Sequence, residues 1–155
     1  DLRLVVIGVE NEQEFLRGVD GAIRDRVVVL PKTPFDKLPE YLSAADILAI
    51  PQRRTSDSIG QMPAKIFDAM AMAKPILATR ISDIPEVLGD CGYLVDPGEP
   101  ARLADAIQYI LSHPDEARKK AVAARERCQQ MYDMKNLELG LRDLVEQVTS
   151  AKGGA

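Results

Sequence analysis

The chain has 155 residues, of which 46% are hydrophobic and 28% are charged, so it is long enough for one domain with a proper core. Its net charge of −4 and pI near 5.1 argue against a general nucleic-acid or anionic-membrane binder, which would need a basic face. A single histidine and two cysteines far apart in the sequence exclude a Cys/His zinc cluster on counting alone.

No apolar run approaches the length of about 18 residues that a membrane-spanning helix needs. The cysteines, Cys91 and Cys128, suit a reducing compartment as free thiols, although they could also pair. We therefore expect a cytoplasmic protein and leave open whether the full-length protein touches a membrane at its periphery. Because the chain begins at Asp1 without a methionine, we expect it to be an excised piece of a longer protein.

The first half of the chain alternates short apolar runs with stretches of helical spacing. Strands are predicted at the β-branched or continuously apolar runs 4–8, 27–30 and 46–50. Helices are predicted at residues 10–24 and 35–45, where apolar side chains recur every three or four positions. The sequence PKTP at residues 31–34 indicates a loop between the second strand and the second helix.

The second half continues the alternation. A polar loop within residues 51–62 leads to a helix at 63–73, where Pro63 suits the first helical position and Lys74-Pro75 ends the helix. Further strands are predicted at 76–79 and 92–95, and helical segments at 84–88, 100–112, 114–132 and 137–148.

Apolar strands separated by helices predict an α/β fold with a doubly wound, mostly parallel sheet of about five strands and a helical C-terminal end. We expect a single domain over residues 1–149 and a flexible tail over 150–155. In such folds ligands bind beyond the carboxyl ends of the strands. The loop at 51–62 and the start of the helix at 63–73 therefore lie on the predicted ligand edge.

This helix carries two charged side chains, Lys65 and Asp68, which are three residues apart and share one side of the helix. A loop that contains Gly60 and feeds a helix start offers free backbone N–H groups to an anion. The pattern predicts a diphosphate site with Lys65 and Asp68 beside it. The alternative is that the two residues form an ordinary surface ion pair.

The sequence PAKIFDAMAMAKPI at residues 63–76 resembles P-x-K-x-x-[DE]-x-M-A-x-x-K-P-[IV], a pattern of GT-B fold glycosyltransferases of the group-1 type. Four further stretches are similar to elements of the same family and occur in the same order: DRVVVL at 25–30, AADI at 44–47, IPEV at 84–87 and GYLVDPG at 92–98. The resemblance covers about residues 4–148. It implies the truncated C-terminal half of the GT-B fold, a Rossmann-like domain that binds a nucleotide sugar.

The resemblance further implies transfer of a sugar from a nucleoside-diphosphate sugar, such as a UDP- or GDP-sugar, to an acceptor with retention. We expect no metal or other cofactor, because Lys65 and the N–H groups around 60–64 can supply the stabilisation and the sequence shows no histidine or carboxylate cluster. Lys65 is the predicted catalytic residue, because a cation stabilises the charge that develops on the departing diphosphate. Asp68 is predicted to accept hydrogen bonds from the ribose hydroxyls. The other predicted nucleotide-sugar-binding residues are Lys32, Thr33, Arg53, Ser58, Gly60, Gln61 and Met62.

Two departures from the family pattern matter. The family often carries an acid eight positions before the second acid, but Gly60 stands there before Asp68. The family's usual first strand of this domain, with a Gly-Arg loop and a Lys-Gly pair, is absent, as is the N-terminal acceptor domain, the expected partner. We therefore expect this fragment to be inactive alone. Two alternatives remain open, a GT-B-like sugar-nucleotide epimerase and a degenerate, non-catalytic scaffold, for which Gly60 is the main argument.

Overall fold

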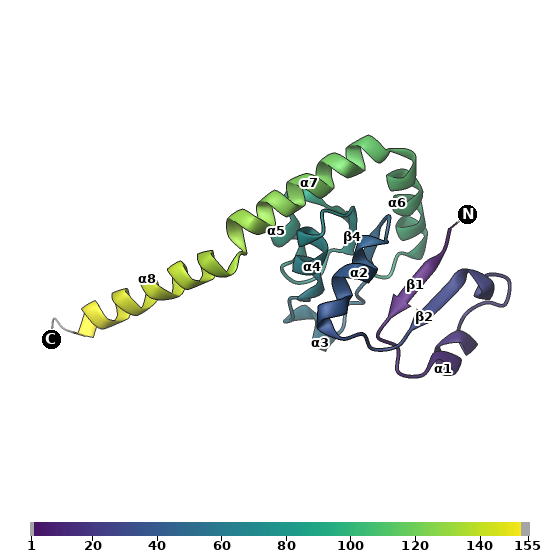
Figure 1. Ribbon diagram of the computed structural model, residues 1–155, viewed down its shortest axis with the longest axis horizontal. Helices are drawn as coiled ribbons and strands as arrows, with labels where there is room; N and C mark the ends of the chain where they lie inside the picture. Colours follow the sequence, from purple (N-terminus) through teal and green to yellow (C-terminus); the bar gives the residue numbers. More distant parts are fainter. Residues whose placement is uncertain (1, 153–155) are drawn as a thin grey trace. The chain divides into compact units, whose positions relative to one another are not determined.

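The computed structural model describes residues 2–152, with side chains as far as Thr149 (Figure 1). The chain forms two compact units, Asp1–Tyr41 and Leu42–Ala155. Each unit has its own strands and is described by itself.

The first unit contains a pair of parallel strands, β1 (Leu4–Ile7) and β2 (Val27–Leu30), in the register Leu4↔Val27 to Ile7↔Leu30. Helix α1 (Glu12–Arg17) and the 3-10 turn η1 (Arg24–Arg26) form the connection between them. The chain leaves β1 through Gly8, whose φ of 92° lies in the region that favours glycine, and the Gly8 N–H donates to the Leu30 carbonyl at 3.1 Å.

The first predicted helix, at 10–24, is wrong at both ends, since α1 covers only residues 12–17. Asn11 caps its start by accepting a hydrogen bond from the Glu14 N–H at 3.1 Å. Beyond its end, the Asp20 carboxylate accepts from the Ala22 N–H at 2.9 Å. This local bond competes with a helical arrangement and ends the helical path before residue 24.

The second unit contains a parallel sheet of β3 (Leu48–Ile50), β4 (Ile76–Thr79) and β5 (Tyr93–Val95), in the order β3-β4-β5. The described strands are thus all paired in parallel, which confirms the predicted fold class, and they lie in a two-stranded and a three-stranded sheet. All of β4 is buried, as expected for a strand with a neighbour on each side and helices on both faces.

The alternation of side chains along β4 separates two hydrophobic clusters. Ile76 and Ala78 belong to one cluster, together with buried residues of the helices α4 (Lys65–Ala71), α5 (Ile84–Leu88) and α7 (Pro114–Met131). Leu77 belongs to the other cluster, with Ile110 and Ala117. The two-sided burial follows from the period of two in a strand. It is the doubly wound arrangement that the sequence predicted.

The helical elements that follow β2 agree with the prediction towards the C-terminus and differ from it near the ligand edge. In chain order they are η2 (Phe35–Lys37), α2 (Leu38–Ser43), α3 (Ser56–Ile59), α4 (Lys65–Ala71), α5 (Ile84–Leu88), η3 (Gly89–Cys91), α6 (Pro100–Ser112), α7 (Pro114–Met131) and α8 (Met134–Lys152). Proline occupies the first position of both α6 and α7, where its missing N–H costs nothing.

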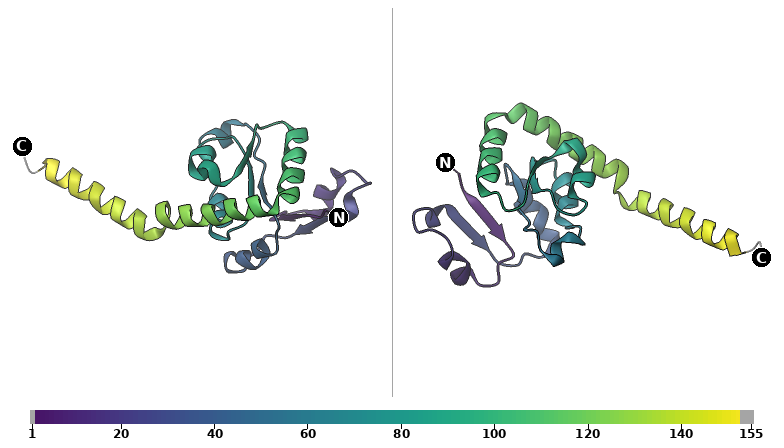
Figure 2. Two further views of the ribbon diagram at one scale, coloured as in Figure 1. Left: turned by 90° about the horizontal axis from the view of Figure 1, so that it is seen from above. Right: turned by 180° about the vertical axis from the view of Figure 1, so that it is seen from behind.

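Helix α8 continues from the end of α7 away from the strands of the second unit (Figure 2). Its first turn is tied to α7 by the Asn136 side chain, which donates to the Gln130 carbonyl at 2.7 Å. The tail was predicted from residue 150; α8 continues to Lys152, and the remainder of that prediction lies outside the described residues. Within residues 2–152, no helix is both long enough and apolar enough to cross a membrane.

Candidate functional site

The carboxyl ends of β3, β4 and β5 lie at one edge of the sheet, because the three strands run in parallel. The loops that follow them begin at Pro51, Arg80 and Asp96. Ligands of open α/β sheets bind at this edge. The predicted loop and helix start after β3 therefore lie on the ligand edge of the second unit.

The loop after β3 contains a short helix, α3, that the sequence analysis took for irregular structure. Thr55 caps it: the Thr55 hydroxyl accepts from the Ser58 N–H at 3.3 Å, and the Ser58 hydroxyl accepts from the Thr55 N–H at 2.9 Å. This reciprocal pair is a capping box, and its sequence signal is a threonine followed three positions later by a residue that can return the bond. Glutamate or glutamine usually fills that position, so the serine at 58 was overlooked.

Ser58 is therefore placed inside the loop. Its hydroxyl is buried, and it also donates to the Arg53 carbonyl at 2.6 Å. A hydroxyl has one proton to donate, and Ser58 uses it within the loop. The structure thus gives Ser58 a part in shaping the loop, whereas the Arg53 side chain is exposed.

Helix α4 begins at Lys65, two residues later than predicted, and ends at Ala71, two residues earlier. Pro63 and Ala64 form a turn before it, in which the Ile66 N–H donates to the Pro63 carbonyl at 3.0 Å. No side chain caps the helix start. With 7 residues the helix is short, and its dipole is a weaker argument for an anion site than the sequence suggested.

Lys65 and Asp68 differ in their surroundings although they share one helix. Lys65 is exposed, whereas Asp68 is half-buried, and burial raises the pKa of its carboxyl above the usual range. The pKa of the Cys128 thiol is raised by burial and by the nearby carboxylates of Asp133 and Asp68. Among the residues that the structure describes, neither Lys65 nor Asp68 forms an ion pair, so the surface-pair alternative is not what the structure contains.

The other predicted residues of the second unit, Gly60, Gln61 and Met62, lie in the segment between α3 and α4. Gly60 has φ −102°, is exposed, and has no atom within 4 Å of the place where a Cβ would stand. Gln61 is exposed, whereas the Met62 side chain packs against the core cluster that contains Ile66. Only the backbone of Met62 is therefore open to a polar role.

Lys32 and Thr33, two of the predicted nucleotide-sugar-binding residues, follow β2 in the first unit. Lys32 is exposed, and the half-buried Thr33 donates its hydroxyl to the Pro31 carbonyl at 3.3 Å. Ser58, Gly60, Gln61, Met62, Lys65 and Asp68 lie in one continuous segment of the second unit. The structure describes Lys32 and Thr33 separately from them.

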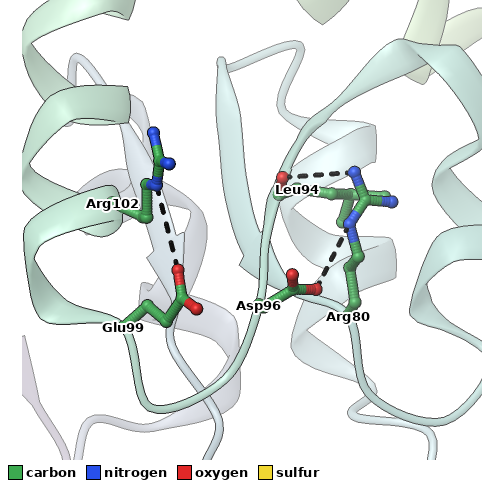
Figure 3. A network of polar contacts seen from close by, with 5 residues as sticks. All are labelled: Arg80, Leu94, Asp96, Glu99 and Arg102. Atoms are coloured by element: carbon green, nitrogen blue, oxygen red, sulfur yellow. Dashed lines mark hydrogen bonds and ion pairs between the residues drawn. The ribbon is translucent and has the colours of Figure 1, made fainter.

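Two residues at the ligand edge were not singled out from the sequence, Thr79 at the end of β4 and Arg80 after it. Figure 3 shows the Arg80 guanidinium between Asp96 and the Leu94 carbonyl, at 3.6 Å from the carboxylate and 3.5 Å from the carbonyl. This contact joins the loops after β4 and β5. A neighbouring exposed pair, Glu99 and Arg102, lies at the start of α6 at 3.9 Å (Figure 3). Exposed pairs of this kind contribute little stability.

No group of three or more histidine, cysteine or carboxylate side chains in the described part of the chain is arranged to hold a metal ion. Both cysteines are free thiols and half-buried.

Parallel strands with helices on both faces, and a polar loop at their carboxyl ends, define a doubly wound α/β domain. Residues 1–113 match the family described as "Glycosyl transferases group 1". The chain belongs to this family.

The relatives that this chain matches are longer than the chain itself, and each match covers only part of the relative. The chain is 32% identical over 118 residues to the D-inositol 3-phosphate glycosyltransferase of Acidothermus cellulolyticus, a match that covers 70% of this chain and 25% of the relative. It is 37% identical over 103 residues to the alpha-maltose-1-phosphate synthase of Mycolicibacterium smegmatis, over 61% of this chain and 25% of the relative. The chain thus spans about a quarter of the length of these relatives.

Solved structures agree on the fold. The sucrose-phosphate synthase from Thermosynechococcus elongatus superposes with a TM-score of 0.79 at 25% identity, over 96% of this chain and 39% of the other. Anabaena HepE, solved in complex with UDP, superposes with a TM-score of 0.80 at 20% identity, over 94% of this chain and 41% of the other. The predicted family and fold are confirmed.

Proposed function

We propose that this chain is the donor-binding half of a glycosyltransferase that moves a sugar from a nucleoside-diphosphate sugar to an acceptor with retention. Membership in the group 1 family is the observation that carries the proposal. An N-terminal acceptor-binding domain would complete the enzyme, which is consistent with the small share of its relatives that this chain spans.

In this proposal Lys65 acts on the diphosphate. Its ammonium group is exposed and has no carboxylate partner among the described residues, so it is available to an anion at no cost in broken ion pairs. A cation at this place stabilises the charge that builds up on the leaving diphosphate. Backbone N–H groups of the segment Gly60–Ala64 would add donors, and no metal or other cofactor is assigned a part.

Asp68 would accept hydrogen bonds from the ribose hydroxyls, which requires its ionised form. Lys32 and Thr33 are proposed beside the base on the resemblance alone. Gly60 leaves the acid of the family pattern unfilled. Its ordinary φ and the open space around it leave room for a larger side chain there.

The experiment is a calorimetric titration of the chain with UDP and with GDP, repeated with Lys65→Ala. A charged hydrogen bond contributes about 1.5–3 kcal/mol, so the loss of Lys65 should weaken binding by roughly tenfold or more. Lys135→Ala, which removes an equal charge from the exposed face of α8, is the matched control and should bind like the unmodified chain. Failure of the unmodified chain to bind either nucleotide at millimolar concentration would overturn the donor site and favour a non-catalytic scaffold.

A further inference from the structure

The ladder between β3 and β4 stops at the point where the proposed donor loop begins. Its last paired residues are Ile50 and Ala78. The Leu48 N–H donates to the Pro75 carbonyl, so the N–H groups that face β4 are those of alternate residues, and the next one after β3 belongs to Gln52. That N–H does not continue the ladder, because it donates to the Ile50 carbonyl instead. The chain therefore leaves β4 here, and the direction in which it leaves determines where the loop starts.

Thr79, the last residue of β4, makes the next connection through its side chain. It is 4% exposed, and its hydroxyl donates to the Gln52 carbonyl at 2.9 Å. The Gln52 N–H donates back to the Ile50 carbonyl at 3.1 Å, so Gln52 is held from both sides. A continued ladder would pair the Gln52 carbonyl with the Ile81 N–H, which donates to the Thr79 carbonyl at 2.9 Å instead. The Thr79 hydroxyl thus takes the place of that backbone donor.

The remaining hydrogen bonds of the loop are local. Ser58 and Thr55 bond to each other and to the Arg53 carbonyl, which fixes the shape of the segment but not its place on the sheet. Among the residues that the structure describes, Thr79 is the only one outside the 51–62 segment that donates a hydrogen bond into it. The loop is thus shaped by its own local hydrogen bonds and is attached to the sheet at Gln52, which we call the root of the loop.

The root already carries one unsatisfied group. The amide oxygen of Gln52 is buried and has no hydrogen-bond partner among the described residues. Removal of the Thr79 hydroxyl would leave the Gln52 carbonyl without its donor as well. Because an unpaired buried acceptor is costly, two such groups on one residue would drive the loop root to rearrange.

We infer that Thr79 is a positioning residue for the donor site: its hydroxyl sets the root of the loop that carries Gly60 to Lys65. The inference rests on the proposed function, since it assumes that this loop binds the nucleotide diphosphate. It assigns Thr79 no contact with the ligand. The role belongs to the hydroxyl and not to the methyl group, which only fills space beside the core.

The test compares Thr79→Val, which keeps the shape and removes the hydroxyl, with Thr79→Ser, which keeps the hydroxyl and removes the methyl group. Binding of UDP or GDP, whichever the unmodified chain binds, is measured by titration. We expect Thr79→Val to raise the Kd at least fivefold and Thr79→Ser to stay within twofold. Both variants lose some stability, so an effect of stability alone would weaken both. Equal binding by the two variants, weakened or not, overturns the inference.

Amide hydrogen exchange of residues 52–60 in the absence of ligand gives a second measurement. Thr79→Val should exchange at least tenfold faster than Thr79→Ser across this segment, while the amides of β4 and α7 change equally in both. Exchange rates that do not distinguish the two variants overturn the positioning role. If the unmodified chain binds neither nucleotide, the donor-site proposal fails and the inference fails with it, whereas the exchange result still shows whether Thr79 fixes the loop.

Discussion

Replacement of Ala73 by glycine should stabilise the protein relative to the same replacement two residues earlier. Ala73 has φ 50°, a left-handed conformation that an L-residue with a Cβ adopts at a cost of about 1–2 kcal/mol. It follows the end of α4, and its N–H donates to the Met70 carbonyl at 3.1 Å. Glycine is the residue that this position favours.

The matched control is Ala71→Gly, at the exposed last residue of α4, where the backbone is helical. Glycine costs about 0.5–1 kcal/mol in unfolded-state entropy at either position, so this term cancels in the comparison. Ala73→Gly also removes a half-buried methyl group, and the loss of its burial costs roughly 0.4 kcal/mol against the strain that is relieved. The difference left between the two variants is about 1 kcal/mol in favour of Ala73→Gly.

Thermal unfolding followed by circular dichroism measures this difference, which corresponds to about 2–4 °C in Tm for a chain of this size. Urea unfolding should give the same order of stability with an unchanged m-value. If Ala73→Gly is no more stable than Ala71→Gly, the left-handed conformation at the end of α4 does not store the strain assigned to it.

Three further predictions concern the ligand edge and the far end of the sheet. Asp68→Asn should raise Tm at pH 7, because burial raises the Asp68 pKa above its usual 3.8 and the wild type therefore loses stability as the pH rises and this carboxyl ionises. The difference in Tm between variant and wild type should vanish in acid, where the carboxyl is protonated. A difference that does not change with pH would contradict this explanation. Burial and the neighbouring Glu116 raise the pKa of Tyr93 from 10.0 to about 12, so the wild type should lose stability as the pH rises from 10 to 12. The urea midpoint of Tyr93→Phe should fall less than that of the wild type over the same pH range. Gly60→Ala, at a position with ordinary φ and no neighbour within 4 Å, should raise the free energy of unfolding by about 0.4–1 kcal/mol, and a lowered urea midpoint would show that the space is not free.

The sequence predicted the strands and the long C-terminal helices well because their signals are strong. Continuous apolar runs mark buried parallel strands, and Pro100 and Pro114 mark helix starts that the structure places at the same residues. The first helix was predicted too long because its apolar spacing continues past Gly18, whereas the local bond made by Asp20 ends the helical path.

The candidate site could be predicted as a place but not as a set of contacts. The motif around Lys65 and Asp68 identified the segment, and the structure confirms that it follows β3 at the ligand edge. Periodicity carries no information on which hydroxyl bonds to which carbonyl, so the bond from the Ser58 hydroxyl to the Arg53 carbonyl could not be predicted. The bond from Thr79 to Gln52 joins residues 27 apart in the sequence, and no local pattern announces it.

Helix α7 has a consequence for α4 that follows from the size of its inward side chains. Ala117, Ala121 and Ala124 are at most 3% exposed, and Ala124 lies in the same core cluster as Ile66 of α4. Because alanine is the smallest residue that has a Cβ, Ala124 lets α7 and α4 approach closely. A bulkier residue at position 124 would overpack the contact between the two helices and displace α4 together with Lys65. The geometry around the proposed leaving group is therefore adjustable from the opposite side of the helix, by changes that never meet the nucleotide.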